Sequence, residues 1–204
     1  MRIWDPTTGS QIGEPLVGHT DRVYEVAVFA APDGTPRIAS ANNESLVGIW
    51  DPSTGTETGA LIFGHEGAVS AVAVFAALDG TPRLATGGVD RTVRIWFPSS
   101  GTQTIEPLTG HTGRVNAVAV FAAPDGTPRL ASAGHDGTVR IWGPATGTGT
   151  ALPLASVIYS LTAGHGLLIA GTEDGFLCLD ISSMYDHPAD AESEEAQRGA
   201  RDEP

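Results

Sequence analysis

The chain of 204 residues has no lysine and one cysteine, Cys178. Without lysine it has no Schiff-base nucleophile and no phosphate-binding loop that ends in Gly-Lys-Ser or Gly-Lys-Thr. A single cysteine cannot form an internal disulfide, which favours a reducing compartment, and we expect its thiol to be buried and inert. The chain also lacks an apolar run long enough to span a bilayer, and it shows no secretion signal. We therefore expect a cytoplasmic protein.

Basic residues are scarce. There are 24 acidic residues against 11 basic ones, all arginine, and the net charge is −13. Such a surface repels phosphate backbones and anionic lipid heads, so the composition predicts no nucleic-acid partner and no membrane partner. The absence of lysine beside abundant Ala, Gly, Arg and Pro is typical of a GC-rich bacterial genome.

Tryptophan is also rare, but its spacing is regular. The four tryptophans are Trp4, Trp50, Trp96 and Trp142, each 46 residues after the last. The dipeptide Gly-His recurs with the same period, and about two thirds of the positions in 65–110 are identical in 111–156. A fixed period of this length predicts an array of repeats, and this identity indicates recent duplication.

Each period contains short segments bounded by turn residues. Residues 115–123 are nearly all apolar, which predicts a strand buried on both faces. The turn sequence PDGTP follows, then strands over 129–134 and 138–142 separated by a second turn, and then a weaker fourth strand. Four antiparallel strands in 46 residues are typical of one propeller blade.

The run from Gly-His to Trp-Asp resembles the WD40-repeat family of β-propellers. The resemblance implies that four side chains in each blade form a hydrogen-bonded set: the His of Gly-His, a Ser or Thr, a turn Asp and the Trp. By position, the complete sets are His65, Thr86, Asp90 and Trp96, and His111, Ser132, Asp136 and Trp142. In the first blade His19, Ser40 and Trp50 are present, but Glu44 stands where the Asp belongs, which predicts a looser network.

We expect an all-β, WD40-type propeller of about four blades. Its predicted parts are a partial blade 1–17, blades of about 18–63, 64–109 and 110–153, a degenerate blade 154–181 and an acidic disordered tail 182–204. Asp180 is expected at the Trp place of the degenerate blade. The blades could close only if a strand at 10–17 completed the last of them, so the fold is expected to be an open arc or a strained small ring. Because Met1 takes the place of Val93, the chain starts inside a repeat, and we expect it to be the tail of a larger propeller or gene.

Catalysis and metal binding are not expected. The recurring histidines belong to different blades and have no second ligand at metal spacing, so we assign them a structural role, with no metal and no cofactor. The chain has no Gly-x-Ser-x-Gly motif and no Cys-His pair. We therefore predict that it is not an enzyme.

The resemblance implies that partners dock on the rim of the propeller near the start of the first strand. Arg, Tyr and His are residue types that anchor interfaces. The chain is therefore expected to be a non-catalytic scaffold or sensor that binds a protein or peptide, and to self-associate through its open edges. Two alternatives remain open: a truncated fragment of a longer signalling ATPase or kinase, and a propeller hydrolase. The candidate partner-binding residues are Arg22, Tyr24, Asn43, Arg114, Asn116 and His135.

Overall fold

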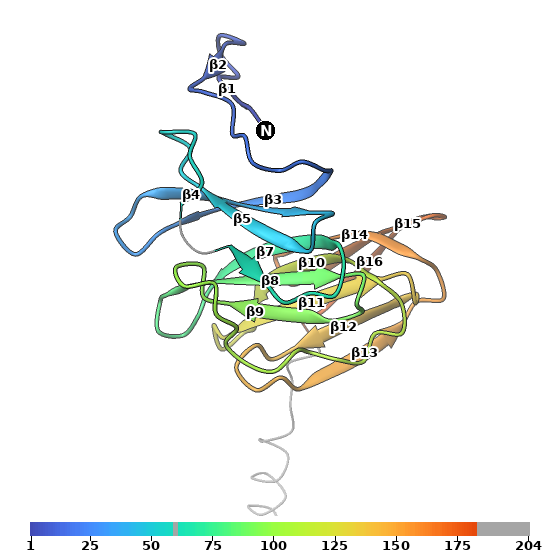
Figure 1. Cartoon of the computed structure of the whole chain (residues 1–204). Coiled ribbons are helices and arrows are strands. Elements are labelled where there is room, and N and C mark those ends of the chain that lie inside the picture. Colours follow the sequence, from blue (N-terminus) through green and yellow to red (C-terminus); the bar gives the residue numbers. More distant parts are fainter. Residues whose placement is uncertain (59–60, 183–204) are drawn as a thin grey trace, which may run out of the picture.

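The computed structural model describes residues 1–58 and 61–182. Every regular element in these residues is a β-strand, as the sequence predicts, and antiparallel pairing groups the strands into separate sheets (Figure 1). Of the predicted disordered tail 182–204, all but Ser182 lies outside the described residues.

Four sheets are successive blades of a propeller. Blade 1 comprises β3 (Val23–Ala30), β4 (Pro36–Asn42), β5 (Leu46–Trp50) and β6 (Ile62–Phe63). Blade 2 comprises β7 (Val69–Ala76), β8 (Pro82–Gly88) and β9 (Val93–Trp96), and blade 3 comprises β10 (Val115–Ala122), β11 (Pro128–Gly134), β12 (Thr138–Trp142) and β13 (Gly149–Pro153). Blade 4 has β14 (Ile158–Gly164), β15 (Leu167–Thr172) and β16 (Gly175–Asp180).

The first hairpin of blades 1, 2 and 3 uses the same turn chemistry. In blade 1 the backbone N–H of Thr35 donates to Asp33 Oδ1 at 2.9 Å, and Gly34 has a φ of 80°. Such a positive φ is easily adopted by glycine, which has no Cβ. The turns at Asp79 and Asp125 repeat this arrangement, so the predicted turn sequence fixes the register of each hairpin.

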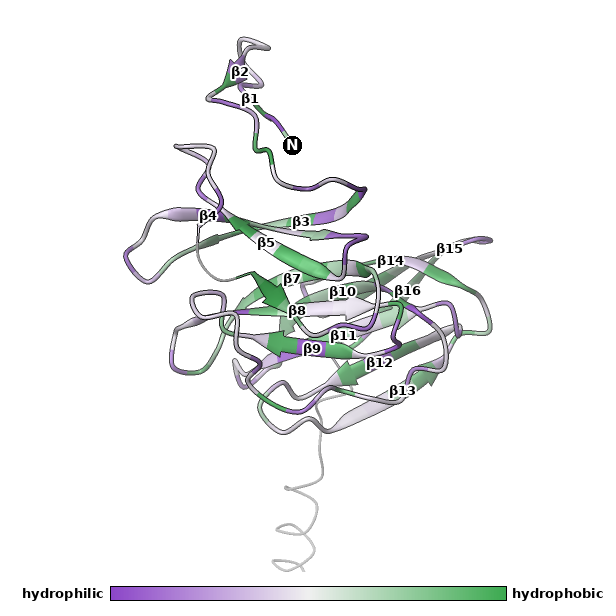
Figure 2. Cartoon of the chain, viewed as in Figure 1, coloured by the Kyte–Doolittle hydropathy of each residue, from purple (hydrophilic) through white to green (hydrophobic). Residues whose placement is uncertain are grey.

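The blades pack face to face through apolar side chains. Figure 2 shows hydrophobic residues along the strands of these blades. We call the face toward the preceding blade the leading face and the opposite one the trailing face. Phe29 and Ile49 on the trailing face of blade 1 pack with Val72 and Leu84 on the leading face of blade 2. The next two junctions repeat the pattern, which explains why the inner strands of blades 2 and 3 are apolar on both faces.

The amino-terminal segment forms the outer half of a further blade. Strands β1 (Ile3–Trp4) and β2 (Gln11–Ile12) pair with each other, and Met1 pairs with Leu16 as Val93 pairs with Leu108 in blade 2. This segment lies beside blade 1 (Figure 1) and does not complete blade 4. The arc is therefore open, and the suggested closure by a strand at 10–17 is wrong.

Two predictions about blade 4 are also wrong. Leu168 pairs with Leu179 as Leu130 pairs with Trp142, so Leu179 and not Asp180 occupies the Trp place. The tight β15–β16 turn, in which Thr172 pairs with Gly175, is one residue shorter than its equivalent and shifts the register. Cys178 is exposed and not buried, because it lies on the trailing face of the last blade, which no described blade covers.

Candidate interaction surface

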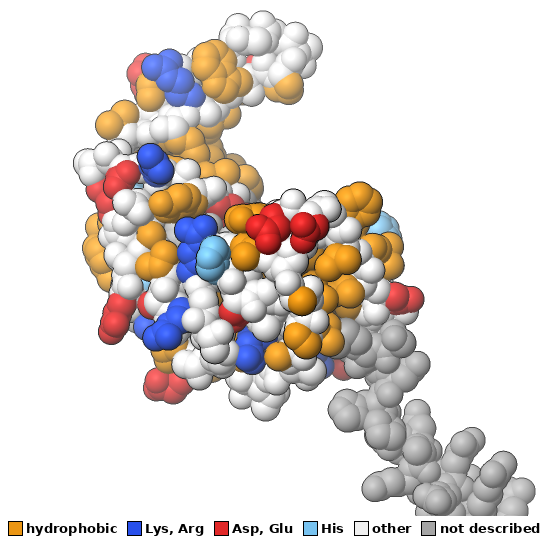
Figure 3. Space-filling view, turned by 90° about the vertical axis from the view of Figure 1, so that its right-hand side faces the viewer, with side chains coloured by type: hydrophobic (Ala, Val, Ile, Leu, Met, Phe, Trp, Pro, Cys, Tyr) orange, Lys and Arg blue, Asp and Glu red, His pale blue; other side chains and the backbone are white. Residues whose placement is uncertain are grey.

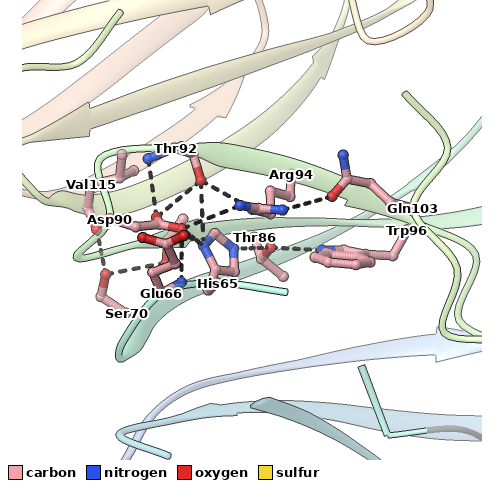
Figure 4. Close-up of polar contacts among 11 residues, drawn as sticks. His65, Glu66, Ser70, Thr86, Asp90, Thr92, Arg94, Trp96, Gln103 and Val115 are labelled. Carbon is pink, nitrogen blue, oxygen red and sulfur yellow. Dashed lines mark hydrogen bonds and ion pairs between the residues drawn. The ribbon is translucent and has the colours of Figure 1, made fainter. Parts of the chain in front are cut away.

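A buried polar network fixes one end of blade 2 (Figure 4). Trp96 Nε1 donates to Thr86 Oγ1 at 2.8 Å, and Thr86 Oγ1 lies 2.7 Å from His65 Nε2. His65 Nδ1 lies 2.9 Å from both carboxylate oxygens of Asp90. Because a carboxylate only accepts, Nδ1 carries the proton, Nε2 accepts from the threonine hydroxyl, and the network has one direction from Trp96 to Asp90.

Blade 3 repeats the network with serine in place of threonine. Ser132 Oγ lies 2.8 Å from both Trp142 Nε1 and His111 Nε2, and His111 Nδ1 lies 2.9 Å from Asp136. Asp136 also accepts from the backbone N–H groups of Thr112 at 2.8 Å and Thr138 at 3.1 Å. The carboxylate thereby ties the loop before the first strand to the turn after the second.

The turn aspartates are ionised acceptors. Burial alone would raise the pKa of Asp136, but donation from Thr112, His111 and Thr138 outweighs it and lowers the pKa to about 2. Burial likewise opposes ionisation of Asp90, yet the bonds from His65 and the backbone hold its pKa well below the usual value. Burial lowers the pKa of His111, so the histidine in this network is neutral.

Blade 1 uses a different residue, Asn42, which sequence reasoning missed. Asn42 is fully buried, and its Nδ2 lies 2.7 Å from His19 Nδ1 and 2.6 Å from Glu44 Oε2, whereas Glu44 itself lies 3.9 Å from His19. The equivalent residue in blade 2 is Gly88, where an added Cβ would lie 2.5 Å from His65 Nδ1. The sequence did contain a signal for this role: Asn42 stands two residues before Glu44, at the position where blade 2 has Gly88 two residues before Asp90.

The amide reverses the direction of hydrogen bonding in blade 1. Asn42 Oδ1 accepts from the backbone N–H of Glu44 at 3.0 Å, which assigns Nδ2 to the histidine side. An amide N–H₂ only donates, so His19 Nδ1 accepts and Nε2 carries the proton. Ser40 Oγ then accepts from both His19 and Trp50. The network is rearranged, and Glu44 lies at its edge.

The networks lie beneath loops that carry most of the predicted partner-binding residues. The same backbone bond joins the two loops in each of the first three blades, from Asn43 N to Arg22 O at 3.0 Å and from His135 N to Arg114 O at 2.9 Å. Tyr24 donates its hydroxyl hydrogen to Asn43 Oδ1 at 3.1 Å. We call Arg22, Tyr24, Asn43, Arg114 and His135, which are all exposed, the recognition rim.

Asn116 is placed differently from the other five candidates. It is half-buried, and its Nδ2 donates to the backbone oxygen of Ile158 in blade 4 at 2.7 Å. Ser70, at the same position in blade 2, donates to the backbone oxygen of Val115 in blade 3. This position therefore joins neighbouring blades, and we remove Asn116 from the recognition rim.

The surface around the recognition rim carries both signs of charge. The amino-terminal end of β3 lies on the right in Figure 1, so Figure 3, which is seen from that side, shows the rim. Arginine and histidine side chains lie near acidic ones there.

Within the described residues, no group of three His, Cys, Asp or Glu side chains could hold a metal ion. No helix in 1–58 or 61–182 is long and apolar enough to cross a membrane.

The opposite rim contains an open cleft between blades 2 and 3. Its volume is about 1060 Å³, and its lining includes Phe75, Phe97, Arg83 and Trp142. The guanidinium of Arg83 lies 4.0 Å from the centre of the Phe97 ring, and its charge is partnered by Asp79 at 3.3 Å. The cleft is mainly apolar, and a smaller equivalent of about 370 Å³ lies between blades 1 and 2.

Two segments, 57–96 and 102–143, match the family model described as "WD domain, G-beta repeat". The chain carries WD40 repeats. No curated protein matches it. Among solved structures it is similar to the computationally designed Ika8 protein, with a TM-score of 0.68 and 24% identity, over 89% of this chain and 52% of that one. The chain thus spans about half of the designed protein, and the likeness concerns the fold alone.

Proposed function

We propose that this WD40 chain is a non-catalytic scaffold that binds a protein or peptide through its recognition rim. WD40 repeats generally mediate protein–protein interactions. The observation that carries the proposal is the pair of backbone bonds that hold Asn43 to Arg22 and His135 to Arg114 above buried networks. Because these backbone segments are already held in place, binding needs little further loop ordering, and arginine, tyrosine and histidine are side chains that suit interface anchors.

The finer part of the proposal concerns the biological setting. We propose a cytoplasmic, bacterial signalling role, in which the repeats act as the sensor half of an ATPase or kinase. An adjoining reading frame that encodes a phosphate-binding loop would support this setting.

The test uses cross-linking and affinity capture with the full chain and two matched double variants. Arg22→Ala with Arg114→Ala removes two arginines from the recognition rim, and Arg37→Ala with Arg129→Ala removes two from the opposite side. We expect a specific partner to be captured by the wild type and by the second variant but lost with the first. Equal capture by both variants would refute the rim as the binding surface.

A further inference from the structure

The leading face of blade 1 is exposed although its residues are the same as those buried elsewhere. Val26 is 48% exposed, whereas its equivalents Val72 and Val118 are 3% and 5% exposed. Val28 is 69% exposed, and Val23 is exposed where its equivalents are fully buried. The difference comes from the neighbouring strands. Among the described residues, only β1 and β2 lie against this face of blade 1, and they cover Ile38 and Trp50 in its outer half.

The trailing face of blade 4 is exposed in the same way. Ile169 and Cys178 pair across β15 and β16 and so lie on one face, and Phe176 lies on that face as the partner of Gly171. Phe176 is 77% exposed. On the opposite face of the same strands, Leu168 and Ala170 are fully buried against blade 3. Figure 3 shows the gap between the two ends of the arc, with hydrophobic side chains on both sides of it.

We propose that two copies of this chain associate head to tail, each copy placing blade 4 against blade 1 of the other, to close one ring. On its leading side the joint would reproduce the junctions inside the chain, because Val23, Val26 and Val28 repeat the valines that blades 2 and 3 present to their preceding blades. This chain covers 52% of the similar designed structure, so two copies together have about the extent of that one chain. A head-to-tail contact used twice forms a closed ring, which leaves no apolar face uncovered.

The strands at the joint also complement each other. Blade 4 supplies three strands, and in the described residues β16 has no further strand along its outer edge. Strand β2 of the second copy can fill that place, as β13 does beside β12 in blade 3. Strand β1 then gives way to β16, because β1 pairs at two positions whereas β16 pairs with β15 at six. An unpaired edge next to an unpaired apolar face favours addition of a strand from another chain.

The first measurement is the mass of the full chain by light scattering across a concentration series. We expect twice the chain mass of 21.0 kDa, with a shift to the monomer on dilution. Because each chain carries a net charge of −13, raising the salt concentration should strengthen an apolar joint. A monomer at all concentrations, or an open ladder of larger masses, would overturn the two-copy ring.

Three variants test the direction of the contact. Val28→Asp alters the leading face, Phe176→Asp alters the trailing face, and Leu78→Asp, which is 73% exposed in a turn away from both, is the control. All three positions are exposed in the single chain, so each variant should keep the wild-type circular-dichroism melt at low concentration. We expect Val28→Asp and Phe176→Asp each to be a monomer when alone. A mixture of the two should form a dimer, because the unaltered face of each can pair with the unaltered face of the other. The control Leu78→Asp should dimerise like the wild type.

Mixing Val28→Asp with Phe176→Asp distinguishes the head-to-tail joint from a symmetric contact, in which the same face of both copies would pair. If two leading faces paired, Phe176→Asp would dimerise by itself and mixing would add nothing, which would overturn the head-to-tail joint. Cys178 gives an independent reading, because its thiol lies on the trailing face and should react more slowly with a thiol reagent in the dimer. Val28→Asp should restore the fast reaction, and an unchanged rate in the wild type would contradict the joint.

Discussion

Replacing Asp136 with asparagine removes one charge from blade 3 with almost no change in shape. Asp136 Oδ2 accepts from His111 Nδ1 and Thr112 N, and Oδ1 accepts from the N–H and hydroxyl of Thr138. An amide has one accepting oxygen, so one of these sides must face an N–H₂ group. If the oxygen stays with His111, the hydroxyl of Thr138 can turn and accept, but its backbone N–H loses its partner.

The expected loss follows from these contacts. The side chain of Asp136 is 5% exposed, so water cannot replace the lost acceptor. One buried donor left unpaired costs about 1–3 kcal/mol, and a charged acceptor contributes about 1 kcal/mol more than a neutral one. Asp136→Asn should therefore lower the free energy of unfolding at pH 7 by about 2–4 kcal/mol.

Urea unfolding followed by tryptophan fluorescence measures this loss, with Glu44→Gln as the matched control. Glu44 bonds to Asn42 and Thr20, but its side chain is 29% exposed and water can take over its contacts. We expect the control to lose less than about 1 kcal/mol, in the range of exposed polar pairs. Equal losses in the two variants would refute the view that Asp136 acts as a buried charged acceptor.

The pH dependence gives a second check. Because the pKa of Asp136 is lowered to about 2 in the folded state, its contribution is fully present above the unfolded pKa near 3.8. It is lost as the pH falls through about 2. The stability difference between wild type and Asp136→Asn should thus shrink as the pH falls from about 4 towards 2. A difference that stayed constant over this acidic range would contradict the assignment.

Three further substitutions test other parts of the structure. Ser132→Ala leaves Trp142 Nε1 and His111 Nε2 without a partner, so urea unfolding should show a loss of about 2–4 kcal/mol, against almost none for the exposed Ser100→Ala. Gly134→Ala would place a Cβ 2.1 Å from the backbone oxygen of Arg114, so a thermal melt should show strong destabilisation, whereas Gly126→Ala meets no atom within 4 Å and should be affected only by its positive φ. Asn42→Gly should destabilise blade 1, and adding Glu44→Asp should recover part of the loss by recreating the blade 2 network; a double-mutant cycle with no coupling would refute the reversed network.

The sequence predicted the repeat, the strands and the residues of the networks because these depend on short-range patterns. Alternating and continuous apolar runs specify strands, Asp-Gly specifies the hairpin turn, and a fixed period places His65, Thr86, Asp90 and Trp96 in register. The sequence also showed that Glu44 replaces the turn aspartate in blade 1. It did not show that Asn42 takes over the contact with His19, because the two residues meet only in the folded blade.

The sequence by itself determined the strands of the blades and their polar networks. The tertiary structure decided which faces of the blades are buried and which are exposed. Val26 and Val72 occupy the same place in nearly the same local sequence, yet one is half exposed and the other buried. The burial of a strand in a propeller depends on the neighbouring blade, whose residues are distant in the sequence. No local sequence pattern therefore encodes that burial. For the same reason only the packed structure shows that Asn116 joins two blades, that Leu179 takes the Trp place, and that the arc stays open between Val28 and Phe176.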